Sequence, residues 1–369
     1  MELCHVLKKG RYGMVIFFAV ACTALCSCGG NVEISFDDLK TDPQAQETNI
    51  PSLAPEESIA RELIIDKKQE IYTYDDMEKD INVLKQIYPD IVTVNELCTT
   101  ADTRKVYDVV VGDINSTEHV MIIGSMHARE YITTQLVMTL MTDLLKNYES
   151  YTYNGISSEE LVKNTAIHFI PMSNPDGVTV AQLGSSALRT QKARQFVDNV
   201  CSESGISYDQ WKANAEGVDI NRNFDAGWDE YTGASGPSAE RYKGTSPGSS
   251  AEAAALIKLT ESYNFRRTIS YHTKGSLIYW YYKQTGSVRD ESEQFVNAIS
   301  SVTGYYPDDN YQAVDAAGYK DWAVYKKGIP SITIEVGGEA PNNPIPYSYF
   351  GSIYDRNKDV VWATLNQMD

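Results

Sequence analysis

The stretch "EHVMIIGSMHAREYITTQLVMTLMTDLLKNY", residues 118–148, joins two different patterns. Its opening, EHVMIIGS, is a short apolar run of the kind that forms a strand buried on both faces of a sheet. From Thr133 onward the apolar residues are typical of a helix. His127 and Glu130 lie between the two segments. Ligands in α/β sheets bind beyond the carboxyl ends of strands, so this junction is a candidate site.

The rest of the chain alternates strand-like and helical segments in the same way. This alternation is typical of an α/β fold whose central strands are buried on both faces of the sheet. Residues 72–92 open the folded part with an amphipathic helix. The expected apolar face of that helix consists of Met77, Ile81, Leu84 and Ile87. Further strands are predicted at 165–172, 266–273 and 331–336, and a further helix at 250–263.

Composition narrows the class of protein. The chain has 369 residues, of which 42% are hydrophobic and 22% charged, as in ordinary globular proteins. Its length allows one large domain or two medium ones. The formal net charge of −18 argues against nucleic acid as a partner, because binding phosphates requires surplus Lys and Arg.

The first 27 residues have the pattern of an export signal. Lys8, Lys9 and Arg11 precede the apolar segment 14–25, which is too short to span a bilayer. The following "CSC" resembles a bacterial lipobox, which would make Cys28 the lipidated first residue of the mature protein. A plain secretory signal cut nearby is the alternative. We therefore expect an exported, lipid-anchored protein at the bacterial cell surface or in the periplasm.

The mature chain is predicted to have two parts. Residues 28–70 are rich in acidic residues, Pro and Thr, a composition typical of a flexible tether, with a folded pro-segment as the alternative. Residues 71–369 are predicted to form one domain, of a size typical of a catalytic domain. Cys98 and Cys201 remain in an oxidising compartment, where the sequence leaves a disulfide between them open.

The histidines are few, which makes their positions informative. Of the five, His5 belongs to the signal, and His119 and His168 have structural explanations at a strand edge or in packing. His127 and His272 both stand at the carboxyl end of a predicted strand, and so do Glu130 and Glu335. Two imidazoles and one carboxylate are a known ligand set for catalytic zinc, with one position left for water. Glu335 could then act as a base.

A series of motifs follows in a fixed order along the chain. Together they resemble the zinc metallocarboxypeptidases of the carboxypeptidase A/B type, over roughly residues 71–369. The resemblance implies a mixed, twisted central sheet of about eight strands with helices on both faces. The motifs are "HARE" (127–130), "SNPDGV" (173–178), "GVDINRNFDAGW" (217–228), "YKGTSPGSSAEAAAL" (242–256), "SYHTKGSLIYW" (270–280), "AAGYKDW" (316–322) and "SITIEVGG" (331–338).

The resemblance assigns the metal site and the base. It implies that one Zn²⁺ is bound by His127, Glu130 and His272, and that Glu335 is the catalytic general base. Zinc acts as a Lewis acid and lowers the pKa of its bound water, and a nearby carboxylate can take the released proton and pass it to the leaving amine.

The resemblance also assigns substrate contacts. Asn221 and Arg222 match the pair that holds the terminal carboxylate of the substrate, and the guanidinium fork suits that role. Arg189, fifteen residues after Asn174, matches the arginine that polarises the scissile carbonyl. Without the resemblance, Arg189 would be explained by a surface ion pair and "NRN" by a structural turn.

Two further assignments concern the substrate side chain. The family has a mobile tyrosine before the Asp-Trp pair, and Tyr311 matches it, although two extra residues separate it from Asp321. Tyr305 or Tyr306 could replace it. Lys320 falls near the position that shapes the side-chain pocket, and there it favours an acidic or carboxylate-bearing substrate. A Lys320 that points into solvent is the alternative.

The expected activity is hydrolysis of peptide bonds next to a free C-terminal carboxylate. "HTKGSLIYW" and "AGYKDW" are most similar to the bacterial γ-D-glutamyl–diaminopimelate peptidases, which cut peptidoglycan stem peptides. A broad nutritional carboxypeptidase is the alternative, and a non-catalytic lipoprotein that binds wall or peptide is a minor one. We expect a monomer that contacts the membrane only through its lipid.

Overall fold

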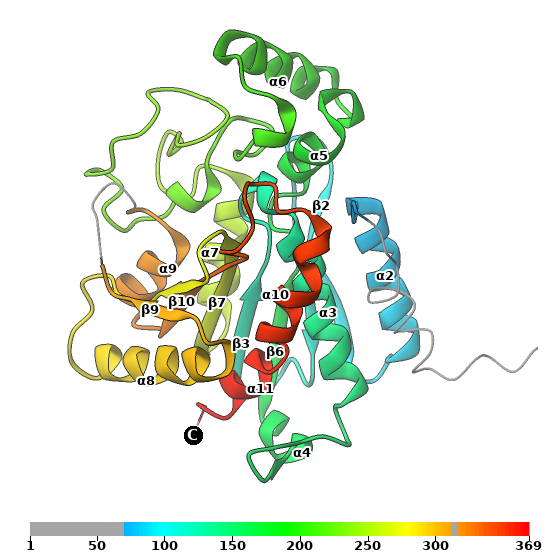
Figure 1. The fold of residues 1–369 in the computed structure, drawn as a ribbon, viewed down its shortest axis with the longest axis vertical. Coiled ribbons are helices and arrows are strands. Elements are labelled where there is room, and N and C mark those ends of the chain that lie inside the picture. Colours follow the sequence, from blue (N-terminus) through cyan, green and yellow to red (C-terminus); the bar gives the residue numbers. More distant parts are fainter. Residues whose placement is uncertain (1–69, 311–315, 369) are drawn as a thin grey trace, which may run out of the picture. The chain divides into compact units, whose positions relative to one another are not determined.

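The computed structural model describes residues 70–310 and 316–368 (Figure 1). The predicted signal 1–27, the lipidation site Cys28, the tether up to residue 69 and Tyr311 lie outside the described residues. Those assignments stay predictions. Within the described ranges, none of the helices combines the length and the apolar character that crossing a bilayer requires.

A mixed sheet of eight strands forms the centre of the fold, which confirms the expected fold class. Strands β6, β3, β7 and β10 run parallel to one another, whereas β1 and β2 on one side and β8 on the other pair in antiparallel fashion. Strand β9 pairs with β8 in parallel. The order across the sheet is β1 (Val92–Thr99), β2 (Lys105–Val111), β6 (Thr165–Ile170), β3 (Glu118–Ile123), β7 (Phe265–Thr273), β10 (Ser331–Val336), β8 (Leu277–Tyr279) and β9 (Tyr306–Asp308).

Helices cover both faces of this sheet (Figure 1). One hydrophobic core joins the sheet to α2 (Tyr74–Ile87), α3 (Ile132–Lys146), α4 (Ser158–Val162), α8 (Gly286–Thr303), α10 (Phe350–Asn357) and α11 (Val360–Leu365). The opposite core joins it to α7 (Ala251–Ser262) and α9 (Tyr319–Trp322). A third, smaller core lies under α5 (Pro175–Leu183) and α6 (Gln191–Ser204). A short ribbon pairs β4 (Thr152–Tyr153) with β5 (Ile156–Ser157).

The alternation of side chains along each strand explains the two cores. On β3, Ile122 packs into the first core and Met121 and Ile123 into the second, because successive side chains point to opposite faces. A strand buried on both sides must therefore be apolar throughout. Five of the six β3 residues are buried, as its apolar run predicts.

Helix α2 begins at a complete capping box. The Thr73 hydroxyl accepts a hydrogen bond from the Asp76 amide, and the Asp76 carboxylate accepts one from the Thr73 amide. Three of the four predicted core-facing residues, Met77, Ile81 and Leu84, are fully buried. The amphipathic helix expected from the sequence is confirmed.

His119 and His168 are structural, as the sequence predicts, but they also form a polar chain. His168 lies between the Asp108 carboxylate, 3.0 Å from its Nδ1, and His119, whose Nδ1 is 2.9 Å from His168 Nε2. All three side chains are buried and come from the neighbouring strands β2, β6 and β3. Cys98 and Cys201 are both free thiols.

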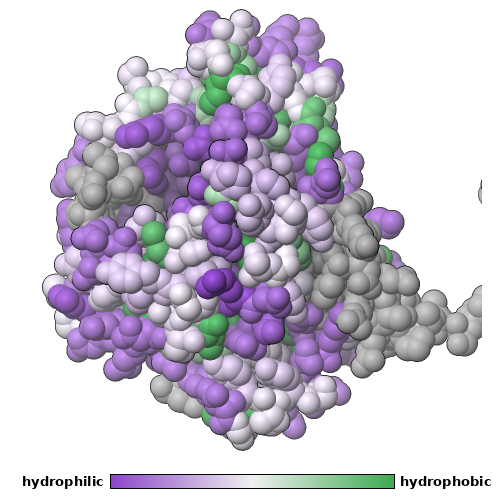
Figure 2. All heavy atoms as spheres, in the orientation of Figure 1, coloured by the Kyte–Doolittle hydropathy of each residue, from purple (hydrophilic) through white to green (hydrophobic). Residues whose placement is uncertain are grey.

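The outer surface is mostly hydrophilic. On the face shown in Figure 2, hydrophobic residues form only small, separate patches. The large apolar side chains that are exposed among the described residues lie apart in the sequence, namely Ile71, Leu183, Tyr208, Tyr306 and Tyr325.

Candidate active site

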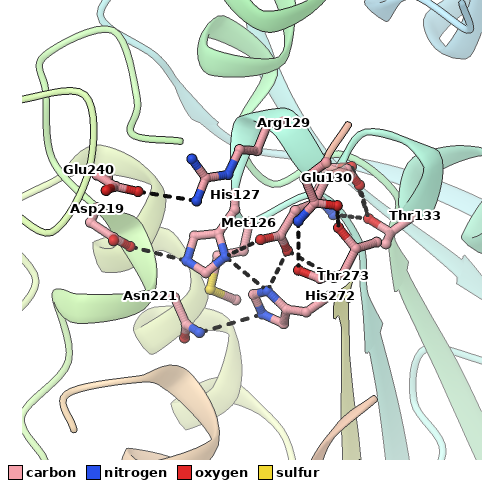
Figure 3. Close-up of polar contacts among 12 residues, drawn as sticks. Met126, His127, Arg129, Glu130, Thr133, Asp219, Asn221, Glu240, His272 and Thr273 are labelled. Carbon is pink, nitrogen blue, oxygen red and sulfur yellow. Dashed lines mark hydrogen bonds and ion pairs between the residues drawn. The ribbon is translucent and has the colours of Figure 1, made fainter. Parts of the chain in front are cut away.

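Glu130 lies between two imidazole rings (Figure 3). Its Oε1 is 3.0 Å from His127 Nδ1, and its Oε2 is 2.9 Å from His272 Nδ1. The two Nδ1 atoms are 3.0 Å apart. One ligand atom from each residue lies within 4.8 Å of the others, and all three residues are buried. The structure thus brings together the three residues that were predicted as metal ligands.

These residues fit a zinc ion. Two imidazole nitrogens and one carboxylate are a ligand set that catalytic zinc uses. The His127 ring is held in place by Asp219, whose carboxylate lies 3.1 Å from Nε2, the ring nitrogen that does not face Glu130. A proton held on Nε2 by that carboxylate leaves the Nδ1 lone pair free to bind a metal. His127, Glu130 and His272 therefore form a possible metal site.

The backbone fixes the ligands from two elements. Glu130 ends the short helix η1 (Ala128–Glu130), which residues 124–127 connect to the end of β3. Its Oε2 also accepts a hydrogen bond from the Thr273 amide at 3.1 Å, and its carbonyl accepts one from the Thr133 hydroxyl at 2.8 Å. Thr273 ends β7 immediately after His272. The end of this strand therefore supplies the ligand His272 and, through the Thr273 amide, also holds the ligand Glu130.

Asp219 was not predicted from the sequence. One carboxylate oxygen of Asp219, Oδ1, contacts His127. The other, Oδ2, accepts a hydrogen bond from the Arg241 amide at 3.1 Å. Burial by itself would raise the pKa of the Asp219 carboxyl, but the nearby His127, Lys212 and Arg222 lower this pKa well below its usual value. Asp219 therefore remains an anion beside the ligand. The available signal was its place in "GVDINRN", two residues before Asn221.

A cavity of about 250 Å³ opens beside the three ligands. Its wall gathers most of the residues that were predicted to contact substrate or to act in catalysis. The lining includes His127, Glu130, Asn221, Arg222, Lys320 and Glu335, together with Lys212, Thr273, Tyr279, Tyr281, Asn310, Gly318, Asp321 and Thr333.

Glu335 contributes a buried carboxyl group whose pKa is raised above its ordinary value. Burial raises the pKa of Glu335 to about 7 against the lowering effect of His272, and the neighbouring Glu130 also raises it. A carboxyl group with a pKa close to the working pH can both accept and return a proton. The position of Glu335 on the cavity wall agrees with the predicted role as base, which stays a prediction.

Asn221 and Arg222 lie on the short helix η4 (Ile220–Arg222) at the edge of the cavity. The Asn221 Nδ2 is 3.4 Å from His272 Nε2, and its Oδ1 accepts a hydrogen bond from the Tyr319 amide at 2.9 Å. The Arg222 guanidinium lies over the Tyr231 ring, 5.5 Å from its centroid. Both side chains are therefore held in place next to the ligand cluster.

Arg189 is not at this site. Its side chain is exposed, donates to the Thr103 carbonyl at 3.1 Å and lies 3.9 Å from the Asp75 carboxylate at the start of α2. This contradicts the predicted role of Arg189 in polarising the scissile carbonyl. The surface ion pair that was its alternative explanation is the observed one.

Lys212 supplies the cation that Arg189 does not. It lines the cavity, and no carboxylate lies within ion-pair distance of its ammonium among the residues that the structure describes. Its charge lowers the pKa of both Asp219 and Glu335, so it acts on both sides of the site. The prediction went wrong because counting from Asn174 assumes a fixed loop length. Here α5 and α6 intervene before the chain reaches the cavity.

Lys320 lines the cavity and is not free in solvent. Its side chain is 11% exposed and lies 2.6 Å from the Asp321 carboxylate, and its ammonium donates to the Tyr281 carbonyl at 2.9 Å. Of the two alternatives to Tyr311, Tyr305 is buried in the first core and Tyr306 is exposed, and neither lines the cavity. The tyrosine assignment stays a prediction.

Comparison with known proteins agrees with this geometry. The sequence model described as zinc carboxypeptidase matches residues 77–350. The chain is 32% identical over 300 residues to gamma-D-glutamyl-L-diamino acid endopeptidase 1 of Lysinibacillus sphaericus, covering 80% of this chain and 73% of that protein. It is 22% identical over 280 residues to carboxypeptidase B of Astacus astacus, covering 72% and 86%.

Solved structures share the fold. Thrombin activatable fibrinolysis inhibitor matches with a TM-score of 0.64 at 18% identity, over 85% of this chain and 80% of that one. Carboxypeptidase A from Helicoverpa armigera matches with a TM-score of 0.63 at 17% identity, over 84% and 80%. The family model matches most of the chain, and His127, Glu130 and His272 lie together beside one cavity. This chain therefore belongs to the zinc carboxypeptidase family, and it is a hydrolase.

Proposed function

We propose that this zinc carboxypeptidase cleaves the bond between a γ-D-glutamyl residue and a C-terminal diamino acid in peptidoglycan stem peptides. The observation that carries the proposal is the group of cations on the cavity wall, in which Lys212 and Arg222 accompany Lys320, itself held by Asp321. A lysine there favours a substrate residue that bears an extra carboxylate, and a diamino acid of the diaminopimelate type has one. The similarity to an endopeptidase named for γ-D-glutamyl-L-diamino acids supports the same substrate class.

The lining of the cavity is suited to an anionic substrate. Lys212, Arg222 and Lys320 bring three cations to a lining that also holds the carboxyl groups of Glu130, Asp321 and Glu335. Asp321 pairs with Lys320, and Glu130 belongs to the metal ligands. Cations inside a partly enclosed cavity attract carboxylates more strongly than they would in open water. In this proposal Asn221 and Arg222 bind the terminal carboxylate, and Lys320 binds the extra carboxylate on the side chain of the same residue.

The residues of the chain divide the chemical work. His127, Glu130 and His272 would hold a zinc ion, which would supply Lewis-acid chemistry toward a carbonyl oxygen and a water molecule. Glu335 accepts the proton of the attacking water and delivers it to the leaving amine. The Lys212 ammonium stabilises negative charge that develops on the carbonyl oxygen. Asp219 keeps His127 in the orientation that the site requires.

Mass spectrometry of reaction products tests the proposal. The purified enzyme is offered stem peptides with a γ-D-glutamyl–diaminopimelate bond, in parallel with a mixed library of ordinary C-terminal peptides. Release of the terminal diamino acid from the stem peptides, at a rate well above the turnover of the library, is the expected result. Broad trimming of the library with intact stem peptides would overturn the proposal and favour a nutritional carboxypeptidase.

We also propose that the enzyme is exported and anchored through a lipid on Cys28. The support is the signal-like and lipobox-like pattern at the start of the sequence. Incorporation of labelled palmitate by the full chain, lost in Cys28→Ala, is the expected result. Equal labelling of the two proteins would contradict the anchor.

A further inference from the structure

A second hollow, of about 580 Å³, lies next to the metal ligands and is not used by the mechanism above. Two cationic side chains, Arg129 and Lys274, are part of its lining. The remaining lining consists of Asp209, Gln210, Pro341, Asn342, Asn343, Pro344 and Pro346.

The hollow adjoins the catalytic cavity at two points of the chain. Arg129 directly precedes the ligand Glu130, and Lys274 directly follows Thr273, which lines the cavity. The two linings are in contact, because the Oδ1 of Asn343, which lines the hollow, accepts a hydrogen bond from the Thr273 hydroxyl of the cavity wall at 2.8 Å. A substrate that extends beyond the ligand cluster on this side would enter the hollow.

His272 lies between the carboxylate clamp and Glu130. Its Nε2 faces Asn221 of the carboxylate clamp, whereas its Nδ1 faces Glu130 (Figure 3). The clamp thus contacts the ligand cluster through His272, whereas the hollow adjoins it through Arg129 and Lys274, the chain neighbours of Glu130 and Thr273. A substrate whose terminal carboxylate is held by Asn221 and Arg222 has its scissile bond at the cluster. Its acyl part then points toward Arg129 and Lys274.

Lys274 is the cation that is available in the hollow. It is exposed, its ammonium donates to the Ala340 carbonyl at 2.9 Å, and it has no carboxylate partner among residues 70–310 and 316–368. Arg129 is already engaged, with the Gln210 carbonyl at 3.0 Å and the Glu240 carboxylate at 3.1 Å. An anion in the hollow would thus pair first with Lys274.

Bond chemistry indicates which anion this is. A γ-linked glutamyl residue uses its side-chain carboxyl in the scissile bond, so its α-carboxylate stays free a few bonds from the reaction centre. An ordinary α-linked peptide has no carboxylate there. We propose that Lys274, supported by Arg129, binds the free α-carboxylate of the γ-glutamyl residue on the acyl side of the bond. This inference rests on the proposed function and adds a recognition site to it.

The test compares two stem tripeptides that differ only in whether the α-carboxyl of the γ-D-glutamyl residue is free or amidated. A charge-assisted hydrogen bond is worth enough that wild type should prefer the free acid by about 10-fold or more in kcat/KM. Lys274→Gln should reduce this preference to about twofold, mainly by losing rate on the free acid. Lys274→Arg should keep most of the preference. Lys192→Gln, on the exposed side of α6, is the matched control and should keep all of it.

Equilibrium binding gives a second, independent measurement. In a Glu335→Gln background, calorimetry should show tighter binding of the free acid than of the amide, and Lys274→Gln should remove the difference. If wild type cleaves both tripeptides equally and Lys274→Gln changes nothing, the inference is wrong while the proposed function stands. If wild type cleaves neither tripeptide but trims ordinary peptides, the proposed function fails and the inference fails with it.

Discussion

Glu335 and His272 are register partners on the neighbouring parallel strands β10 and β7. Partners in adjacent strands point to the same face of a sheet. The proposed base and a metal ligand therefore emerge side by side, and the residues before them, Ile334 and Tyr271, pack into the opposite core. The pleat of the sheet, more than any flexible loop, sets the distance between base and metal site.

Replacing Glu335 with Gln should lower kcat by about 10²–10⁴-fold, because the amide cannot accept the proton of the attacking water. The bound zinc should stay near one per protein, since Glu335 is not one of the three ligands. Steady-state kinetics and elemental analysis of the same preparation measure both quantities. Near-normal turnover in this variant would rule out the role of Glu335 as base.

Replacing His272 with Ala should remove most of the zinc, because two ligands hold the metal much more weakly than three. Zinc per protein, measured by elemental analysis after dialysis, checks this. Asn221→Ala, which changes a direct neighbour of His272 without removing a ligand, is the control and should retain its zinc. Equal zinc contents in the two variants would contradict the ligand set.

Replacing Asp219 with Asn should weaken zinc binding by about 10-fold, because a neutral partner holds the His127 ring less firmly. Competition with a chelator of known affinity measures the change. Asp219→Ala should weaken binding further, since it removes the hydrogen-bond acceptor as well as the charge. A chelation midpoint that does not move in either variant would show that Asp219 does not position the ligand.

Replacing Lys212 with Ala should lower kcat/KM by about 10²-fold or more, because charge on the carbonyl oxygen would lose its cationic partner. Lys212→Arg should recover part of the rate, since it restores the charge with a different shape. Arg189→Ala should stay within about twofold of wild type, as expected for an exposed surface pair. A large loss in Arg189→Ala with little change in Lys212→Ala would reverse the assignment.

Glu252 should make stability depend on pH. Burial raises the pKa of this carboxyl to about 7, and the Asn214 amide donates to it at 3.0 Å. The folded protein therefore keeps a proton that the unfolded chain releases above about pH 4.5. As a result, the free energy of unfolding falls between about pH 4.5 and 7, by up to about 3 kcal/mol from this group.

The variant Glu252→Gln removes this titration and should be more stable than wild type at pH 8. At pH 5 the two proteins should be nearly equally stable. Urea unfolding at both pH values measures the difference between them. A difference that is the same at pH 5 and pH 8 would show that Glu252 does not hold its proton in the folded state.

Much of the fold and of the metal site could be predicted from the sequence. The apolar run of β3 and the period of α3 mark where the chain turns from strand to helix, and His127 and Glu130 lie at that junction. His272 and Glu335 also end strands. Because the carboxyl ends of parallel strands meet at one edge of a sheet, local patterns were enough to bring these four residues together.

The wrong assignment of Arg189 and the omission of Asp219 have one cause. A local sequence pattern does not show which residues distant in the sequence come together in the fold. Arg189 was chosen by counting residues, but the chain reaches the cavity wall only after α6, at Lys212. Asp219 was missed because its role depends on a contact with His127, 92 positions earlier in the sequence. Neither contact leaves a periodic signal, so only the folded structure could reveal it.

The "NRN" motif contains residues that serve different purposes. Asn221 and Arg222 line the cavity, whereas Asn223 is buried and donates to the carbonyls of Lys243 and Ser246 at 2.7 and 2.8 Å. Its Oδ1 also accepts a hydrogen bond from the amide of Ser250, the N-cap of α7, at 2.9 Å.

Asn223 therefore has a structural role: its hydrogen bonds hold neighbouring segments of the chain together. A descendant of this enzyme that had lost catalysis could discard Asn221 and Arg222 freely, yet would still need Asn223 to keep α7 and the segment before it in place. Within the motif, Asn223 therefore stabilises the fold, whereas Asn221 and Arg222 are the residues placed at the cavity.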